Sequence, residues 1–180
     1  MNKLLIKIGT KLSRHEIKEI NQAKAREFKV PPLQQKDLKD SLFFLLLGDK
    51  KILAVGELIS VRPINFNGET FFILGIGGVL ANEKRKGYGR QIMTAIKDYL
   101  ITKNKTGVGF CRLQNKGFYE KCGFNVDETS IKRFIFQQES QKITNSGDHC
   151  VLYLDVSDHF MQKVLSCHDK EVILPRPPDW

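Results

Sequence analysis

A cluster of basic residues interrupted by two glycines is the feature of the sequence most suited to chemistry. It reads Lys84-Arg85-Lys86-Gly87-Tyr88-Gly89-Arg90 and separates an apolar run ending at Leu80 from a run of helical periodicity. Glycines let a backbone approach a ligand, and the first turn of a helix offers unpaired amides and a dipole that attract anions. The cluster predicts a pyrophosphate-binding loop, although a strand-to-helix turn with a basic rim would have the same composition.

Two common phosphate-binding patterns are absent from this segment. Ile92 and Met93 stand where a GxGxxG fingerprint needs its third glycine, and no GK[ST] sequence follows. Metal binding is not indicated either, because the four cysteines form no CxxC pair and have no ligand spacing with the histidines. We therefore expect free thiols in a reduced compartment and no metal cofactor.

The basic loop resembles the pyrophosphate loop of the GNAT superfamily of acyl-CoA-dependent N-acyltransferases, usually written [Q/R]xxGx[G/A]. Lys84 occupies the first position, which keeps the charge but loses the fork of an arginine. A second segment, Gly117-Phe118-Tyr119-Glu120-Lys121-Cys122-Gly123-Phe124, looks like the family's FYxKxGF segment. The two motifs occur in the family's order, and the resemblance covers roughly residues 3 to 155.

The resemblance implies an α/β (α+β) fold with a mixed, mostly antiparallel central sheet of about seven strands. Helices would flank the sheet, and two central strands would splay apart at the acyl-CoA site. Acetyl-CoA would be the co-substrate, and the acceptor amine would attack its thioester directly. By analogy with the family, the residues binding acetyl-CoA would be Gly78, Val79 and Leu80 on the strand and Lys84, Arg85, Lys86, Gly87, Tyr88, Gly89 and Arg90 in the loop.

The resemblance also suggests catalytic groups. Tyr119 matches the tyrosine that donates a proton to the departing CoA thiolate in many relatives, although it could instead be a core tyrosine on a short helix. An ammonium acceptor must lose a proton before it attacks, so a carboxylate, or a water held by one, is expected as the base. Glu57 and Glu83 are the candidates, and each could equally be a surface or hairpin charge.

Three features are similar to aminoglycoside 2'-N-acetyltransferases: the short spacing from Cys111 to Phe118, the GFYEKCGF segment, and an acidic residue followed by tryptophan at the end. Asp179 and Trp180 would then bind the substrate, because paired carboxylates attract cationic amines. The formal charge of +9 argues against a polycationic acceptor. The tail could instead be a disordered end or an oligomer contact.

The secondary structure needed to position these groups can be predicted from periodicity and turn residues. Ser13-Arg14-His15-Glu16 has the form of a capping box at the start of a helix, and Asn67-Gly68 suits a tight hairpin turn. Residues 138–148 are expected to be an exposed polar loop, and the chain from Ser157 a short helix with an irregular tail. Strands are predicted at 3–8, 42–47, 52–61, 70–80, 108–112, 132–136 and 150–155, the last two completing a mixed sheet, and helices at 13–28, 89–102 and 116–121.

A chain of 180 residues, 41% of them hydrophobic, favours one domain, with a core at 3–155 and a tail at 156–180. No apolar stretch is long enough to span a membrane, so we expect a cytoplasmic protein. Dispersed lysines, among them Lys11, Lys18 and Lys24, are interpreted as solvated surface. The predicted partner is a small-molecule amine, with a homodimer possible. The alternative is a non-catalytic acyl-CoA-binding or nucleic-acid-binding module, although nucleic acid is disfavoured because the phenylalanines lie mostly in apolar strand runs.

Overall fold

The computed structural model describes residues 2–28, 31–49, 51–138, 141–144 and 147–175. The chain divides into two compact units. The first contains Met1–Ile59 and Gly78–Ile96, and the second contains Ser60–Gly77 and Lys97–Trp180. The division falls within strand β6 (Leu74–Ala81) and within helix α3 (Tyr88–Lys103). No helix among the described residues is long and apolar enough to span a bilayer.

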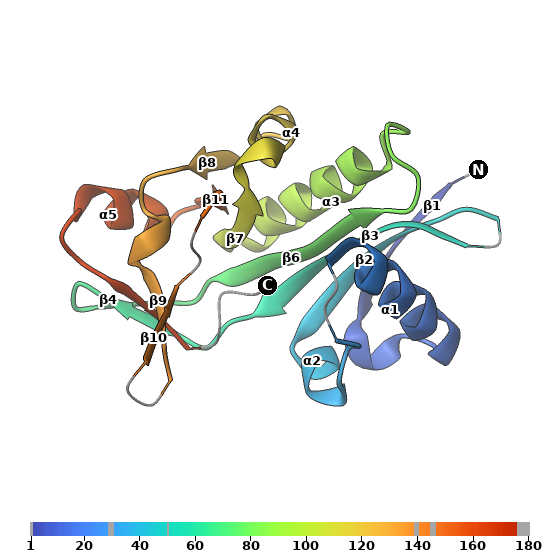
Figure 1. The fold of residues 1–180 in the computed structure, drawn as a ribbon, viewed down its shortest axis with the longest axis horizontal. Coiled ribbons are helices and arrows are strands. Elements are labelled where there is room, and N and C mark those ends of the chain that lie inside the picture. The colour runs from blue at the N-terminus through green and yellow to red at the C-terminus, as the bar shows by residue number, and fades with distance from the viewer. Residues whose placement is uncertain (1, 29–30, 50, 139–140, 145–146, 176–180) are drawn as a thin grey trace. The chain divides into compact units, whose positions relative to one another are not determined.

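A seven-stranded sheet forms the framework, in the order β1-β2-β3-β6-β7-β11-β8 (Figure 1). Strands β1, β2 and β3 pair antiparallel, as do β7, β11 and β8, whereas β6 and β7 run parallel. This confirms the predicted mixed, mostly antiparallel sheet flanked by helices. Its other strands are β1 (Lys3–Ile8), β2 (Ser41–Leu47), β3 (Ile52–Ser60), β7 (Gly107–Arg112), β8 (Asn125–Asp127) and β11 (His149–Leu154).

Helix α1 (Arg14–Phe28) begins at the predicted capping box. The amide of Glu16 donates to the Ser13 hydroxyl at 3.2 Å, and the amide of Ser13 donates to the Glu16 carboxylate at 2.7 Å. Two amides at the helix start are thereby satisfied. The short helix α2 (Gln35–Lys39) follows before β2.

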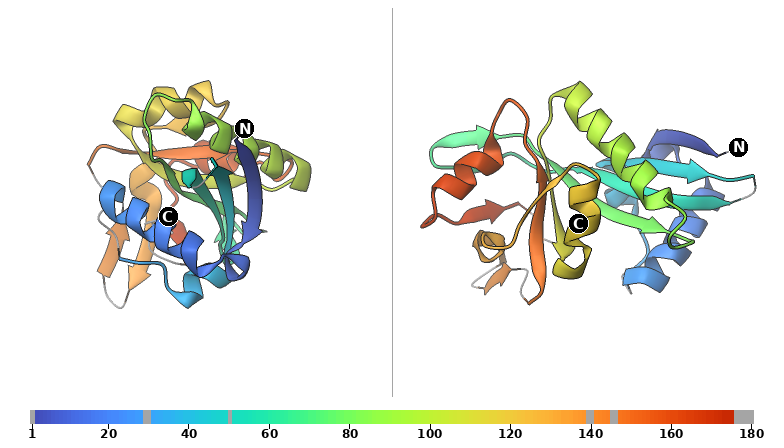
Figure 2. Two further views of the ribbon diagram at one scale, coloured as in Figure 1. Left: turned by 90° about the vertical axis from the view of Figure 1, so that its right-hand side faces the viewer. Right: turned by 90° about the horizontal axis from the view of Figure 1, so that it is seen from above.

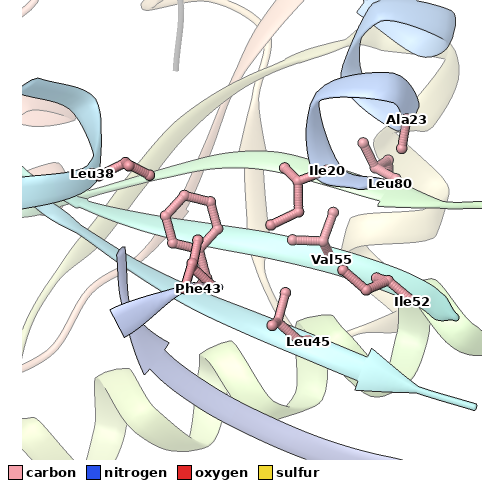
Figure 3. Close-up of a cluster of buried hydrophobic side chains, with 9 residues drawn as sticks. Ile20, Ala23, Leu38, Phe43, Leu45, Ile52, Val55 and Leu80 are labelled. Carbon is pink, nitrogen blue, oxygen red and sulfur yellow. The ribbon is translucent and has the colours of Figure 1, made fainter. Parts of the chain in front are cut away.

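The core of the first unit lies between α1 and strands β2 and β3 (Figure 1 and Figure 2). Ile20 and Ala23 of α1 are buried, and Leu80 contributes from β6. The side chains converge in Figure 3. Burial of this apolar surface holds α1 on the sheet and fixes which residues of the helix face β3. Strands β2 and β3 contribute Phe43, Leu45, Ile52 and Val55 to the cluster.

The second unit begins with a hairpin of β4 (Ile64–Phe66) and β5 (Glu69–Phe71). Asn67 and Gly68 have φ of 51° and 82°, which confirms the predicted turn. The prediction of one strand over 70–80 is wrong, because β5 and β6 belong to different sheets and Phe72 and Ile73 between them belong to neither strand. Phe72 is exposed at this break between the two strands.

A separate three-stranded sheet corrects the prediction for the C-terminal part. Strand β9 (Phe134–Gln138) pairs antiparallel with β10 (Gln141–Thr144) and parallel with β12 (Val172–Leu174). The segment predicted at 132–136 is therefore not part of the main sheet, and part of the predicted 138–148 loop is a strand. The Arg133 guanidinium donates to the carbonyls of Val164 and Cys167. These bonds fix the end of helix α5 (Phe160–Ser166) and the segment that follows it. That segment leads into β12, so the part of the tail that was predicted to be irregular contains a strand.

We predict that Gly56→Ala destabilises the protein by about 1–3 kcal/mol, which lowers Tm by several degrees. An added Cβ at Gly56 would lie 2.5 Å from Cγ2 of Ile92 and 2.9 Å from Cδ1 of Ile96, both fully buried. Thermal unfolding measures the effect. Gly117→Ala in α4 (Lys116–Lys121) is the matched control, because nothing lies within 4 Å of its Cβ position. Equal Tm values for the two variants would contradict this packing.

Candidate functional site

The basic loop joins β6 to α3, as the sequence predicted. Arg85 and Gly87 have left-handed φ values of 60° and 76°, and no atom lies within 4 Å of a Cβ built on Gly87. The first bond of α3 runs from the amide of Gln91 to the carbonyl of Gly87. The preceding amides of the first turn have no partner within the helix, so they are free to bind an anion approaching over the glycine.

The charges around the loop divide into paired and unpaired groups. Lys84 lies 2.8 Å from Glu27, which connects the start of the loop to the end of α1. The exposed side chains of Arg85, Lys86 and Arg90 form no salt bridge in the described part of the chain. These three cations surround a helix start, where positive charge would otherwise be unfavourable. An anion bound there would compensate both the cations and the dipole.

Glu83 lies just before the loop and is partly exposed to solvent. Its carboxylate accepts a hydrogen bond from Lys51 at 2.8 Å, and this bond lowers its pKa. A lowered pKa makes a carboxylate a weaker proton acceptor. The arrangement is that of a surface ion pair, which is one of the two alternatives considered for Glu83 above.

Strand β6 contains a local irregularity at Gly78. Its φ is +57°, a conformation that L side chains rarely adopt. The parallel register with β7 covers only Leu74 to Ile76 of β6, so Gly78, Val79 and Leu80 lie beyond it. An extended ligand can pair only with backbone groups that no neighbouring strand uses, and beyond Ile76 the edge of β6 that faces β7 meets this requirement.

Glu57 of β3 is buried beside this irregularity. One carboxylate oxygen accepts a hydrogen bond from the Ser41 hydroxyl at 2.7 Å, and the other accepts one from the Lys24 ammonium at 3.1 Å. The side chain of Glu57 is 4% exposed, and that of Lys24 is 15% exposed. A Cβ on Gly78 would lie 3.0 Å from the Lys24-bound oxygen of Glu57. Thus the structure places Glu57 against the strand predicted to bind the acyl group.

Lys24 and Ser41 are site residues that the sequence analysis missed. Lys24 was interpreted as solvated surface, and this is wrong because its ammonium is buried against Glu57. A signal was present: Lys24 follows Ile20 by four residues, which places it on the buried side of α1. Ser41 carried no such signal, because a serine before an apolar run is also typical of a strand start.

Tyr119 belongs to α4 in the second unit and is partly buried. Burial raises the pKa of its phenol, and the nearby Cys111 and Cys122 thiols raise it further. The ring packs edge-on against Phe118 with a centroid distance of 5.0 Å. Gly123, with φ of 83°, ends the helix as predicted. A phenol in these surroundings stays protonated at neutral pH and can serve as a hydrogen-bond or proton donor.

Other predicted site features are not placed by the structure. Asp179 and Trp180 lie outside the described residues. No group of three or more histidine, cysteine, aspartate or glutamate side chains gathers as a metal site among the described residues. Burial raises the pKa of Cys111 to about 12, which fits a packing role for this thiol.

Comparison with solved structures identifies the fold independently. The structure of ElaA from Escherichia coli is 16% identical, with a TM-score of 0.62 over 86% of this chain and 100% of that chain. An acyl-CoA N-acyltransferase from Pseudomonas aeruginosa is 16% identical, with a TM-score of 0.58 over 84% and 98%. An acetyltransferase from Bacillus subtilis, solved in complex with CoA, is 18% identical, with a TM-score of 0.53 over 86% and 99%.

The comparison of sequences agrees with the structural likeness. No curated protein matches this chain significantly. The model of the acetyltransferase (GNAT) family, however, matches residues 13–124, a stretch that contains α1, the basic loop and the Tyr119 segment. The chain therefore belongs to the GNAT acetyltransferase family.

Proposed function

We propose that this protein is an acetyl-CoA-dependent N-acetyltransferase that transfers an acetyl group to a primary amine of a small molecule. The observation that carries the proposal is the loop before α3, where an open glycine and the first amides of the helix coincide with three cations that form no salt bridge among the described residues. The Bacillus subtilis structural neighbour was solved with CoA bound, which supports the same ligand class. Free thiols and the acetyl-CoA requirement are consistent with a cytoplasmic location.

The binding residues of the proposal are those predicted from the sequence. The amides from Arg85 to Arg90 would hold the pyrophosphate, with Lys84 and Lys86 adding charge. The backbone of Gly78, Val79 and Leu80 would pair with the pantetheine arm. Two features support this assignment: no atom lies within 4 Å of a Cβ built on Gly87, and the register with β7 ends at Ile76, before Gly78.

In the proposed reaction the acceptor amine attacks the thioester carbonyl, the C–N bond forms, and the C–S bond breaks. Tyr119 is proposed to donate its phenolic proton to the leaving thiolate, where negative charge develops. Glu57 and Glu83 are the candidates for the base, directly or through water. Glu57 is buried beside Gly78 and bonded to Lys24 and Ser41, whereas Glu83 is partly exposed, paired with Lys51, and has a lowered pKa.

The acceptor class is part of the proposal. Aminosugars come first in an amine screen because of the similarity to aminoglycoside 2'-N-acetyltransferases, and polyamines come second. Asp179 and Trp180 are proposed to contact the acceptor, and removing both residues tests that role. Tight, strongly salt-dependent nucleic-acid binding without acetyl transfer would instead favour the non-catalytic module.

The first prediction concerns acetyl-CoA binding. Calorimetry on the wild type should show micromolar affinity, roughly −8 kcal/mol. Replacing Lys84, Arg85 and Lys86 by alanine should weaken it by about tenfold or more, because each cation lost leaves phosphate charge uncompensated. Lys11→Ala with Lys18→Ala is the matched control, since both are exposed lysines outside the loop. Wild-type protein that does not bind acetyl-CoA would refute the proposed function.

The second prediction concerns Tyr119→Phe. We expect turnover of a responding amine to fall by roughly 10²-fold, while acetyl-CoA affinity stays unchanged, because only the proton donor is removed. Since the pKa of Tyr119 is raised above its ordinary value of 10.0, the phenol should cause no loss of activity below pH 10. Tyr153→Phe on β11 is the control. Unchanged turnover in Tyr119→Phe would remove this residue from the mechanism.

A further inference from the structure

The group formed by Lys24, Glu57 and Ser41 joins three elements of the first unit at one point. Lys24 comes from α1, Ser41 begins β2, and Glu57 lies in the middle of β3. The Ser41 backbone pairs with Ile59 rather than with Glu57, so its hydroxyl reaches along the sheet to the carboxylate. Both carboxylate oxygens are thereby occupied, which is how a buried charge is normally accommodated.

Stability alone is a poor explanation for this buried group. Removing an ammonium and a carboxylate from water carries a desolvation penalty that their attraction often only offsets, and apolar replacements of similar volume are frequently neutral or stabilising. Among the salt bridges of the described residues this pair is the least exposed; the next is Lys7–Glu16, whose side chains are 30% and 13% exposed. A pair as little exposed as this one therefore suggests a role besides folding.

The place where the pair sits indicates that role. Glu57 and Lys24 border the position that a Cβ of Gly78 would take: it would lie 3.0 Å from a Glu57 oxygen, 3.5 Å from its Cβ and 3.6 Å from the Lys24 ammonium nitrogen. The strand adopts its left-handed φ directly over this charge pair. The polar group thus forms the surface against which the irregular part of β6 rests.

We infer that Lys24, Glu57 and Ser41 form a brace that fixes the conformation of β6 at Gly78 and so positions its backbone for the acyl arm of acetyl-CoA. The inference rests on the proposed function and adds Lys24 and Ser41 to it as positioning residues. Glu57 acquires a role that does not depend on proton transfer. Loss of the brace lets β6 relax toward a regular strand, and the backbone groups of Gly78 then no longer match the ligand.

The test measures acetyl-CoA affinity by calorimetry and stability by thermal unfolding, neither of which needs an acceptor. In Lys24→Met/Glu57→Leu the charge pair becomes apolar, so Tm should stay within about 4 °C of the wild type. Affinity should nevertheless fall by about tenfold. Lys24→Arg keeps a cation within reach of Glu57 and should retain more affinity than Lys24→Met. Lys142→Met, which removes an exposed pair with Glu171, is the matched control and should leave affinity unchanged.

The outcomes separate the brace from its alternatives. If Glu57 acts only as a base, Glu57→Gln lowers turnover and leaves acetyl-CoA affinity at the wild-type value, which overturns the inference. Reduced Tm with unchanged affinity in the double variant assigns the pair to stability and also overturns it. If the double variant does not fold, Ser41→Ala is the deciding variant. The brace predicts that its affinity for acetyl-CoA is about threefold weaker than that of the wild type. If the wild-type protein does not bind acetyl-CoA, the proposed function itself is refuted.

Discussion

The ion pair of Glu57 with Lys24, set against the left-handed backbone of Gly78, is the constraint that links the proposed acyl-binding strand to the rest of the first unit. A charge pair tolerates little displacement in a low-dielectric interior, so it fixes α1, β2 and β3 relative to one point of β6. Only glycine adopts this backbone conformation without strain. The glycine at position 78, its left-handed φ and the polar group beside it therefore belong together. Packing around Ile20 and Val55 then orients α1 so that Lys24 reaches the carboxylate.

Charge organises the loop in a different way. The net charge of +9 is spread over the chain, but at the start of α3 it is combined with free amides and an open glycine. Positive side chains at a helix start oppose the dipole, so their concentration there makes sense when an anion is bound. Lys84 is held by Glu27, while Arg85 and Lys86 remain available to that anion.

The prediction from sequence succeeded where a local signal determines structure. The capping box at Ser13, the turn at Asn67-Gly68 and the helix end at Gly123 follow from side-chain and backbone preferences that act over a few residues. It failed where pairing is non-local. The assignment of β9 to a separate sheet and the parallel pairing of β12 depend on contacts between segments far apart in the chain. The partnership of Lys24 with Glu57 is of the same kind, and periodicity alone indicated only that Lys24 lies near the buried side.

The most direct test of the account is a crystal structure of the protein with CoA. The account predicts the pyrophosphate on the amides between Arg85 and Arg90, the pantetheine arm along Gly78 to Leu80, and the Lys24–Glu57 contact unchanged beneath it. CoA bound elsewhere on the chain, with the basic loop empty and β6 uncontacted, would contradict the account.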